Sequence, residues 1–484
     1  MASPPHEADD WIRPTPSVGL SLLPVVALVA LLAAVIGGMG GGGHIPLVLA
    51  TAVAGAVAAW GLKMPWPRIE AGMVRGISGG LHAVLVLLVV GMLVGVWIAA
   101  GVVPLLIHYG LMVLAPGWFL VASCIICAVV ALATGSSWST AATVGLALVG
   151  VGEALGVHAG MTAGAIVSGS YFGDKMSPLS DTTNLAPAAA GAELFEHIQH
   201  MLWTTVPALL VSLVAFGVMG FGDRASTGGG GDLDAISTGI STAFSLSPVL
   251  LLPPVVVLGL VFRRVPALPA LLAGTLVAAV LAVVVQGAAV ADVVSASMGG
   301  YSSDTGVASV DKLLSRGGMG SMLETIALIV SALAFAGVME ASGMLDSLAR
   351  AVLSRAKGSG GLVLATAASA MGLNVLASDQ YIAIIVPGRM YRTAFLERRL
   401  HPKNLSRVLE DAGTMTSPLV PWNTCGAYMS GVLGVATVAY APFALMNLLT
   451  PLLTIVYGFT RFSIEEVSEA EARRRLGLAG EGSA

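Results

Sequence analysis

Long runs of apolar residues recur along the whole chain, separated by short polar or glycine-rich stretches. Most runs are about 17 to 25 residues long, the length that an α-helix needs to cross a hydrocarbon layer about 30 Å thick. The pattern therefore predicts an all-α polytopic membrane protein. The expected membrane helices lie at residues 18–37, 44–62, 81–101, 117–134, 201–221, 248–262, 265–285, 320–341, 359–376 and 437–460.

The composition excludes an ordinary soluble protein. Of the 484 residues, 56% are hydrophobic and 10% are charged, whereas soluble domains carry about 25% charged residues. Residues 1–17 are expected to form a disordered tail, and residues 461–484 a C-terminal tail. The chain has no phosphate loop, dinucleotide fingerprint, H-E-x-x-H motif or serine nucleophile elbow. We therefore expect a transporter driven by an ion gradient rather than an enzyme, with no cofactor and no nucleic-acid partner.

Two parts of the chain repeat each other at a constant spacing. Arg75-Gly76 precedes the third apolar run, and Arg316-Gly317 precedes the eighth, 241 residues later (316 − 75). Ser177-Pro178-Leu179 recurs as Ser417-Pro418-Leu419 after 240 residues (417 − 177). Such repetition is typical of transporters. We expect repeats at 18–222 and 247–460, joined by a glycine-rich linker at 223–246.

The distribution of basic residues predicts that the repeats are inverted, because lysine and arginine accumulate in cytoplasmic loops. Residues 389–407 hold six of them, whereas the matching part of the first repeat, 149–167, holds none. The two loops are therefore expected on opposite sides of the membrane. Basic residues after the second apolar run and in the C-terminal tail predict that both termini are cytoplasmic. We expect the chain in the cell (plasma) membrane.

Segments 117–152 and 359–393 are expected to form re-entrant hairpins, each of which enters and leaves the membrane on one side. A polar turn interrupts each apolar run, at a depth where an unpaired polar group costs several kcal/mol. Hydroxyls that bond back to their own helix are the structural alternative. The turns offer the candidate ion ligands Ser136, Ser137, Ser139, Thr140, Asn374 and Asp379.

The most polar stretch within the apolar chain lies in a predicted broken helix at 158–196. Pro178 and Pro187 interrupt any helix there, and half-helices around a polar break are typical of transporter sites. Asp174 adjoins Lys175, and we weigh a structural ion pair between them equally with direct ion binding. The candidate ligands of this break are Asp174, Asp181, Thr182, Thr183 and Asn184.

A second broken helix is expected at 405–437, at the matching place in the other repeat. It contains two adjacent carboxylates, one of which is expected to carry the transported proton. Hydroxyl and amide side chains follow within fifteen residues. The candidates here are Glu410, Asp411, Thr416, Ser417, Asn423 and Thr424.

These residue types favour Na⁺/H⁺ exchange. A small hard cation such as Na⁺ prefers oxygen ligands, and broken helices supply both side-chain oxygens and freed backbone carbonyls. We expect Na⁺ to be bound by Asp181, Thr183 and Ser139. A buried carboxylate that binds either the cation or a proton couples the two fluxes, and desolvation favours its protonated form. Na⁺ and H⁺ are thus the expected substrates.

Several of these stretches resemble the NhaC family of Na⁺/H⁺ antiporters. The resemblance implies a scaffold domain, a mobile elevator-like transport domain with two re-entrant hairpins, and a homodimer. Members exchange Na⁺, and some Li⁺, for protons, while others exchange organic acids such as malate for lactate. The matching strings are GSSWST at 135–140, GSYFGDKMSPLSDTTNLA at 169–186, ASDQYI at 377–382, LEDAGT at 409–414 and PWNTCG at 421–426.

Two alternatives stay open. An organic-acid antiporter of the same family would need buried cations to receive a dicarboxylate, and only Lys175 and Arg389 lie near the polar breaks. We therefore favour Na⁺/H⁺ exchange. Tyr171-Phe172-Gly173-Asp174 is similar to the G-x-G-D motif of intramembrane aspartyl proteases, but a tyrosine stands where the first glycine belongs.

Overall fold

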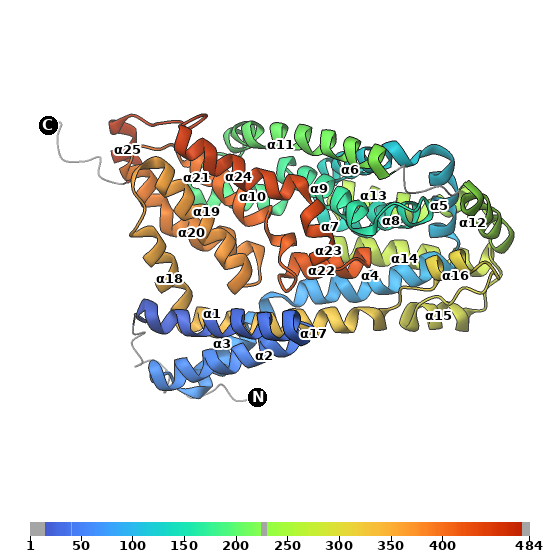
Figure 1. The fold of residues 1–484 in the computed structure, drawn as a ribbon, viewed down its shortest axis with the longest axis horizontal. Coiled ribbons are helices and arrows are strands. Elements are labelled where there is room, and N and C mark those ends of the chain that lie inside the picture. Colours follow the sequence, from blue (N-terminus) through green and yellow to red (C-terminus); the bar gives the residue numbers. More distant parts are fainter. Residues whose placement is uncertain (1–14, 40, 224–229, 477–484) are drawn as a thin grey trace.

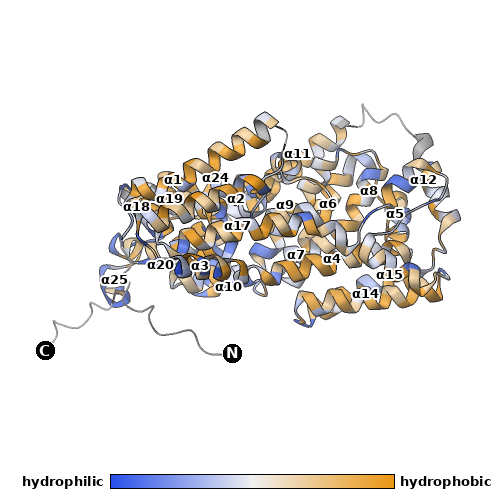
Figure 2. Cartoon of the chain, turned by 90° about the horizontal axis from the view of Figure 1, so that it is seen from below, coloured by the Kyte–Doolittle hydropathy of each residue, from blue (hydrophilic) through white to orange (hydrophobic). Residues whose placement is uncertain are grey.

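The computed structural model describes residues 15–39, 41–223 and 230–476. In these ranges the chain is helical, apart from connecting segments and one isolated bridge between Leu400 and Glu466. Eight of the described helices are long and apolar enough to cross a membrane, or up to ten if each of two bent pairs is one crossing. Figure 2 shows apolar residues on most helices and hydrophilic residues near α25 (Glu469–Arg475). The predicted all-α polytopic membrane fold is confirmed.

The helices of the first half follow the apolar runs closely. α1 and α2 each continue in a π-helical stretch, at Ala33–Gly38 and Val57–Gly61. The tail predicted at 1–17 lies almost wholly outside the described residues. The helices are α1 (Val18–Leu32), α2 (His44–Ala56), α3 (Trp66–Gly79), α4 (Leu81–Ala99), α5 (Val102–Val113), α6 (Pro116–Thr134), α7 (Ser137–Thr140), α8 (Leu146–Ala154), α9 (Ala159–Met176), α10 (Asp181–Ala190) and α11 (Leu194–Asp223).

The second half differs from the sequence prediction in two places. The connector predicted at 223–246 contains a helix, α12, and the last apolar run is divided near Ala444 into α23 and α24. The helices are α12 (Gly230–Ala243), α13 (Leu252–Phe262), α14 (Ala267–Val284), α15 (Val290–Gly299), α16 (Ala308–Leu314), α17 (Leu323–Ala341), α18 (Met344–Leu353), α19 (Gly358–Leu376), α20 (Gln380–Glu397), α21 (Pro402–Leu409), α22 (Thr424–Leu433), α23 (Thr437–Tyr440), α24 (Leu445–Thr460) and α25.

The two halves contain helices of matching order and length. A long helix (α4 or α17) and a shorter one (α5 or α18) precede two helices joined by a tight turn (α6 with α7–α8, or α19 with α20). A broken helix follows in each half, α9–α10 in the first and α21–α22 in the second. Figure 1 shows α4 and α17 lying along one side of the molecule, with the broken helices above them.

Proline and hydroxyl side chains produce the first helix break. Ser177 precedes Pro178 and adopts an extended conformation (φ −80°, ψ 127°), because a residue before proline disfavours the helical region. The Thr183 hydroxyl lies 2.8 and 2.9 Å from the carbonyl oxygens of Asp174 and Lys175. It thereby satisfies two acceptors that the end of α9 leaves without a helical partner.

Each broken helix joins two separate apolar clusters. Residues of α9 and α22 belong to a large cluster built around α4 and α14. Residues of α10 and α21 belong to a smaller cluster with α19 and α20. A third cluster connects α1, α2 and α3 to α17. The polar breaks therefore lie at the boundary between two well-packed bodies.

Glycines allow α6 and α9 to approach closely. An added Cβ at Gly169 would overlap the backbone of Cys124, and one at Gly173 would overlap the backbone of Ala131 and Leu132. The two glycines are four residues apart, the small-xxx-small spacing that lets membrane helices pack backbone to backbone. Gly173 precedes Asp174, so this contact also positions the first buried carboxylate.

Gly173→Ala should destabilise the protein, because the new methyl group has no room against α6. We expect a loss of about 1–3 kcal/mol, as for other overpacked interiors, measured as a lower melting temperature in detergent. Gly372→Ala is the matched control, since Gly372 lies within α19 and an added Cβ there meets nothing within 4 Å. Equal melting temperatures for the two variants would contradict the close packing of α6 on α9.

Candidate functional site

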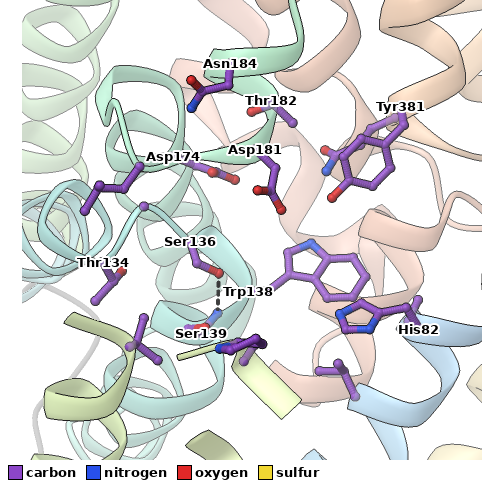
Figure 3. A pocket seen from close by; sticks show the side chains of 18 of the residues that line it. His82, Thr134, Ser136, Trp138, Ser139, Asp174, Asp181, Thr182, Asn184 and Tyr381 are labelled. Atoms are coloured by element: carbon purple, nitrogen blue, oxygen red, sulfur yellow. Dashed lines mark hydrogen bonds between the residues drawn. The ribbon is translucent and has the colours of Figure 1, made fainter. Parts of the chain in front are cut away.

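A cavity of about 730 Å³ lies where the first helix break meets both hairpin turns. Figure 3 shows its labelled side chains, with Asp181, Trp138 and Tyr381 around the same space. The cavity joins elements that are far apart in sequence. Of the predicted ligands, Ser136, Ser139, Asp174, Asp181, Thr182, Asn184, Asp379 and Thr424 line it, whereas Ser137, Thr140, Thr183, Asn374, Glu410, Asp411, Thr416, Ser417 and Asn423 do not.

Asp174 is held by two hydroxyls. Ser137 of the first hairpin donates to its Oδ2 at 2.6 Å, and Ser180 of the break donates to its Oδ1 at 2.5 Å. The ion pair considered between Asp174 and Lys175 is not present, and that alternative was wrong. Adjacent residues on a helix do not face each other, so the two side chains leave α9 in different directions.

Lys175 pairs instead with Asp411, from the second broken helix. Both side chains are 0% exposed, and the lysine Nζ donates to Asp411 Oδ1. The Thr204 hydroxyl of α11 donates to the same carboxylate oxygen at 3.1 Å and accepts from Lys175 Nζ at 3.3 Å. This contact connects α9, α11 and the segment after α21. Sequence analysis missed it, although Thr204 is a polar residue within an apolar run.

The two hairpin turns contact their helix breaks in the same way. Gly135 adopts a left-handed conformation (φ +71°), and an added Cβ there would lie 2.7 Å from the Leu179 backbone carbon. Ser378, in the second turn, is also left-handed (φ +57°), and its carbonyl accepts from the Thr424 backbone N–H at 2.9 Å. Each turn therefore touches the residues that begin the second half-helix.

The hydroxyls of the first turn divide into structural and cavity-lining groups. Ser136 Oγ accepts from the Ser139 backbone N–H at 3.1 Å and so caps α7. The Thr140 hydroxyl donates to the Ser136 carbonyl at 2.9 Å. Ser139 Oγ is buried and has no hydrogen-bond partner among the described residues. Ser139 therefore offers a free oxygen ligand at the cavity wall.

Asp181 is the exposed carboxylate of the cavity. It is the first residue of α10 and lies beside Thr182, whose hydroxyl is 3.1 Å from that of Ser180. The N-terminus of a helix carries a partial positive charge that stabilises a carboxylate there. Asn184 donates to the carbonyls of Pro178 and Ser180, at 2.9 and 2.7 Å, and so closes the loop between the half-helices.

Amide and hydroxyl groups satisfy the second break internally. Asn374 of α19 donates to the Gly413 carbonyl at 2.6 Å and to the Thr416 hydroxyl at 2.9 Å. Asn423 donates to the Asn374 carbonyl at 3.1 Å, and its own side-chain oxygen caps α22. Ser417 donates to the Thr414 carbonyl at 2.7 Å. These side chains hold the break together rather than facing the cavity.

Asp379 has a mixed position. Its Oδ1 accepts from the backbone N–H groups of Tyr381 and Ile382, at 2.9 and 3.1 Å, which makes it the cap of α20. It also lines the cavity together with Gln380 and Tyr381. A carboxylate fixed by two backbone donors retains an oxygen that can bind a cation.

Glu410 differs from every other predicted ligand. It is 0% exposed in a π-helical turn, Glu410–Thr414, and neither of its carboxylate oxygens has a hydrogen-bond partner among the described residues. The hydroxyls of Thr182 and Thr414 lie next to it without the geometry of a hydrogen bond. Thr182 thus separates the cavity from a buried carboxylate that has no fixed partner.

Several cavity residues could not be found from the local sequence pattern. His82 at the start of α4 and Arg264 between α13 and α14 line the wall, and both are exposed there. Trp138 stacks on Tyr428 of α22, with ring centroids 3.9 Å apart and planes 13° apart. The Tyr428 hydroxyl donates to the Trp138 carbonyl at 3.0 Å. The aromatic pair thereby fixes the first hairpin turn to the second half of the chain.

The donor set suits a hard cation rather than a transition metal. Within the described ranges, no group of three or more His, Cys, Asp or Glu side chains is arranged to hold a metal ion. Of the three predicted Na⁺ ligands, Asp181 and Ser139 share the cavity wall. The Thr183 hydroxyl is occupied by the backbone of α9, so the structure does not bring it to the cavity.

Comparisons with known proteins give one family. The model of the "Na+/H+ antiporter family" matches residues 169–462, more than half of the chain. The Na(+)/H(+) antiporter NhaC of Alkalihalophilus pseudofirmus is 40% identical over 432 residues, which cover 89% of this chain and 93% of the relative. The family is one of transporters, so it does not support the protease alternative.

Two further relatives carry other names. The arginine/ornithine antiporter ArcD of Halobacterium salinarum is 37% identical over 449 residues, covering 92% of each chain. The malate-2H(+)/Na(+)-lactate antiporter of Bacillus subtilis is 37% identical over 403 residues, covering 82% of this chain and 85% of the relative. Similarity over nearly the full length, together with the family match and the two broken helices, shows that this chain belongs to the Na⁺/H⁺ antiporter family, the family of NhaC.

Proposed function

We propose that the chain exchanges Na⁺ for H⁺ across the cell membrane. The observation that carries this proposal is the placement of two carboxylates on either side of Thr182. Asp181 faces the cavity, and Glu410 is buried behind it without a partner. An unpartnered charge in an apolar interior is costly, so Glu410 is suited to hold a proton and to release it when a cation arrives.

Na⁺ and H⁺ are the substrates of this mechanism, and the chain needs no resident cofactor. Na⁺ enters the cavity and binds oxygen atoms of Asp181, Ser139 and Asp379. Its positive charge next to Thr182 favours the ionised form of Glu410, which then gives up its proton. When Na⁺ leaves on the other side, Glu410 takes a proton again. Competition between the two cations at one site produces the exchange.

The proposed architecture consists of two inverted repeats at 18–222 and 247–460, with an elevator-like transport domain formed by the hairpins and broken helices. The matching helix order of the two halves and the two left-handed hairpin turns support it. The basic residues at 389–407 support cytoplasmic termini. A homodimer through the scaffold is the arrangement that the family resemblance implies.

Exchange of an organic solute is the second candidate. A volume of about 730 Å³ is far larger than Na⁺ needs and lies in the range of small-molecule sites. Arg264 and His82 on the wall could receive a carboxylate, a cation supply that sequence analysis did not foresee. The names of the two further relatives point to such solutes for those proteins. The favoured substrate stays Na⁺, because the carboxylates face the opposite wall.

Proton movement in proteoliposomes separates these candidates. We expect an imposed Na⁺ gradient alone to drive proton flux in purified protein, whereas gradients of malate, lactate, arginine or ornithine alone should not. The measurement is the fluorescence of an internal pH dye against empty liposomes. A response to one of the organic solutes and none to Na⁺ would overturn the proposal and favour the second candidate.

Asp181→Asn should abolish Na⁺-driven exchange, because it removes the charged ligand of the cavity while keeping the side chain's size. Asp292→Asn, at an exposed carboxylate of α15 away from the cavity, is the matched control and should exchange normally. The rate is measured over a pH series, and size-exclusion in detergent verifies that both variants are folded. Full activity and an unshifted pH profile in Asp181→Asn would remove Asp181 from the site.

A further inference from the structure

A second, smaller cavity lies on the other half of the molecule. It has a volume of about 160 Å³ and is bounded by the start of α17, by the second helix break and by the bend between α22 and α23. No predicted ligand lines it. The residues that matter for the argument are Thr325, Leu328, Pro421, Ala427, Ser430 and Thr437.

The small cavity occupies the same place in the second repeat as the large one does in the first. Ala83 and Val86 of α4 line the large cavity, and the residues at the equivalent positions of α17 are Thr325 and Leu328. The spacing is 242 residues in both cases (325 − 83 and 328 − 86). Leu179 in the first break and Pro421 in the second line the two cavities at the same spacing (421 − 179). Each cavity therefore lies between equivalent helices.

The two cavities face opposite ends of the molecule because α4 and α17 are antiparallel. An added Cβ at Gly80, just before α4, would touch Leu333 in the middle of α17, whereas one at Gly91, in the middle of α4, would touch Gly318 and Met322, just before α17 begins. The starts of the two helices thus point in opposite directions. Each cavity lies beside the start of its own helix.

The cavities differ in size because only one of them is closed. Next to the small cavity, α22 packs directly on α17, where an added Cβ at Gly431 would lie 3.4 Å from Thr325 Oγ1. α23 and the turn after it bend back from α22 by 88°. The Thr437 hydroxyl donates to the Gly426 carbonyl at 3.0 Å, and Tyr440 donates to the Pro418 carbonyl at 2.6 Å. These two bonds hold α23 against the second break.

We propose that the small cavity is the closed access path of the opposite membrane face. It opens between α17 and α22 when the large cavity closes, and the solute that enters by one leaves by the other. This inference rests on the proposed exchange function, since only a transporter that alternates between two faces needs both paths. Thr325, Ser430 and Thr437 then line the second path with hydroxyl groups, in keeping with a hydrated cation.

A bifunctional thiol reagent tests the proposal on the full-length protein. In Thr325→Cys/Ser430→Cys, a short bis-methanethiosulfonate should bridge α17 to α22 and hold the small cavity closed. Exchange in proteoliposomes should fall to the level of empty liposomes and return when dithiothreitol cuts the bridge. The native cysteines Cys124, Cys127 and Cys425 are all buried, and the unsubstituted protein treated in the same way is the control.

Accessibility gives a readout that does not depend on the transported solute. A membrane-impermeant thiol reagent should label Thr325→Cys from one face and Ala83→Cys from the other. Labelling of both from the same face would overturn the proposal, and so would an unchanged exchange rate after complete cross-linking. If neither the double variant nor the unsubstituted protein exchanges Na⁺ for H⁺, the proposed function fails, and the labelling result still decides whether the small cavity is an access path.

Discussion

The arrangement of the site depends on the buried ion pair between Lys175 and Asp411. Two fully buried charges are tolerated only when each compensates the other, and removing one partner of such a pair costs about 3–5 kcal/mol. The pair connects the last turn of α9 in the first half of the chain to the π-helical turn after α21 in the second half. The two helix breaks are thereby held against each other.

The same contact distinguishes two neighbouring carboxylates. Asp411 has a lysine and a threonine as partners, whereas Glu410, the preceding residue, has neither an ion pair nor a hydrogen bond among the described residues. The sequence shows only two adjacent acids. In the fold, one of them has a structural role, and the other is available to bind and release a proton beside Thr182.

The sequence predicts the parts of the fold that depend on local chemistry. Apolar runs predicted the membrane helices, and prolines among hydroxyl residues predicted both helix breaks. Contacts between distant segments were not predictable in this way. The partner of Lys175 lies 236 positions away, and Arg264 reaches the cavity from a connector with no polar pattern of its own. The ion pair considered between Asp174 and Lys175 was wrong because adjacency in sequence does not bring helical side chains together.

Glu410 gives the most direct test of proton coupling. Glu410→Gln keeps the shape of the side chain and removes its titratable proton, and Glu397→Gln, at an exposed position on α20, is the matched control. The measurement is Na⁺-driven proton flux in proteoliposomes, with folding checked by size-exclusion in detergent. The account predicts that folded Glu410→Gln protein moves no protons in response to Na⁺, while the control behaves like the unsubstituted protein. Normal proton flux with an unchanged pH profile in Glu410→Gln would contradict it.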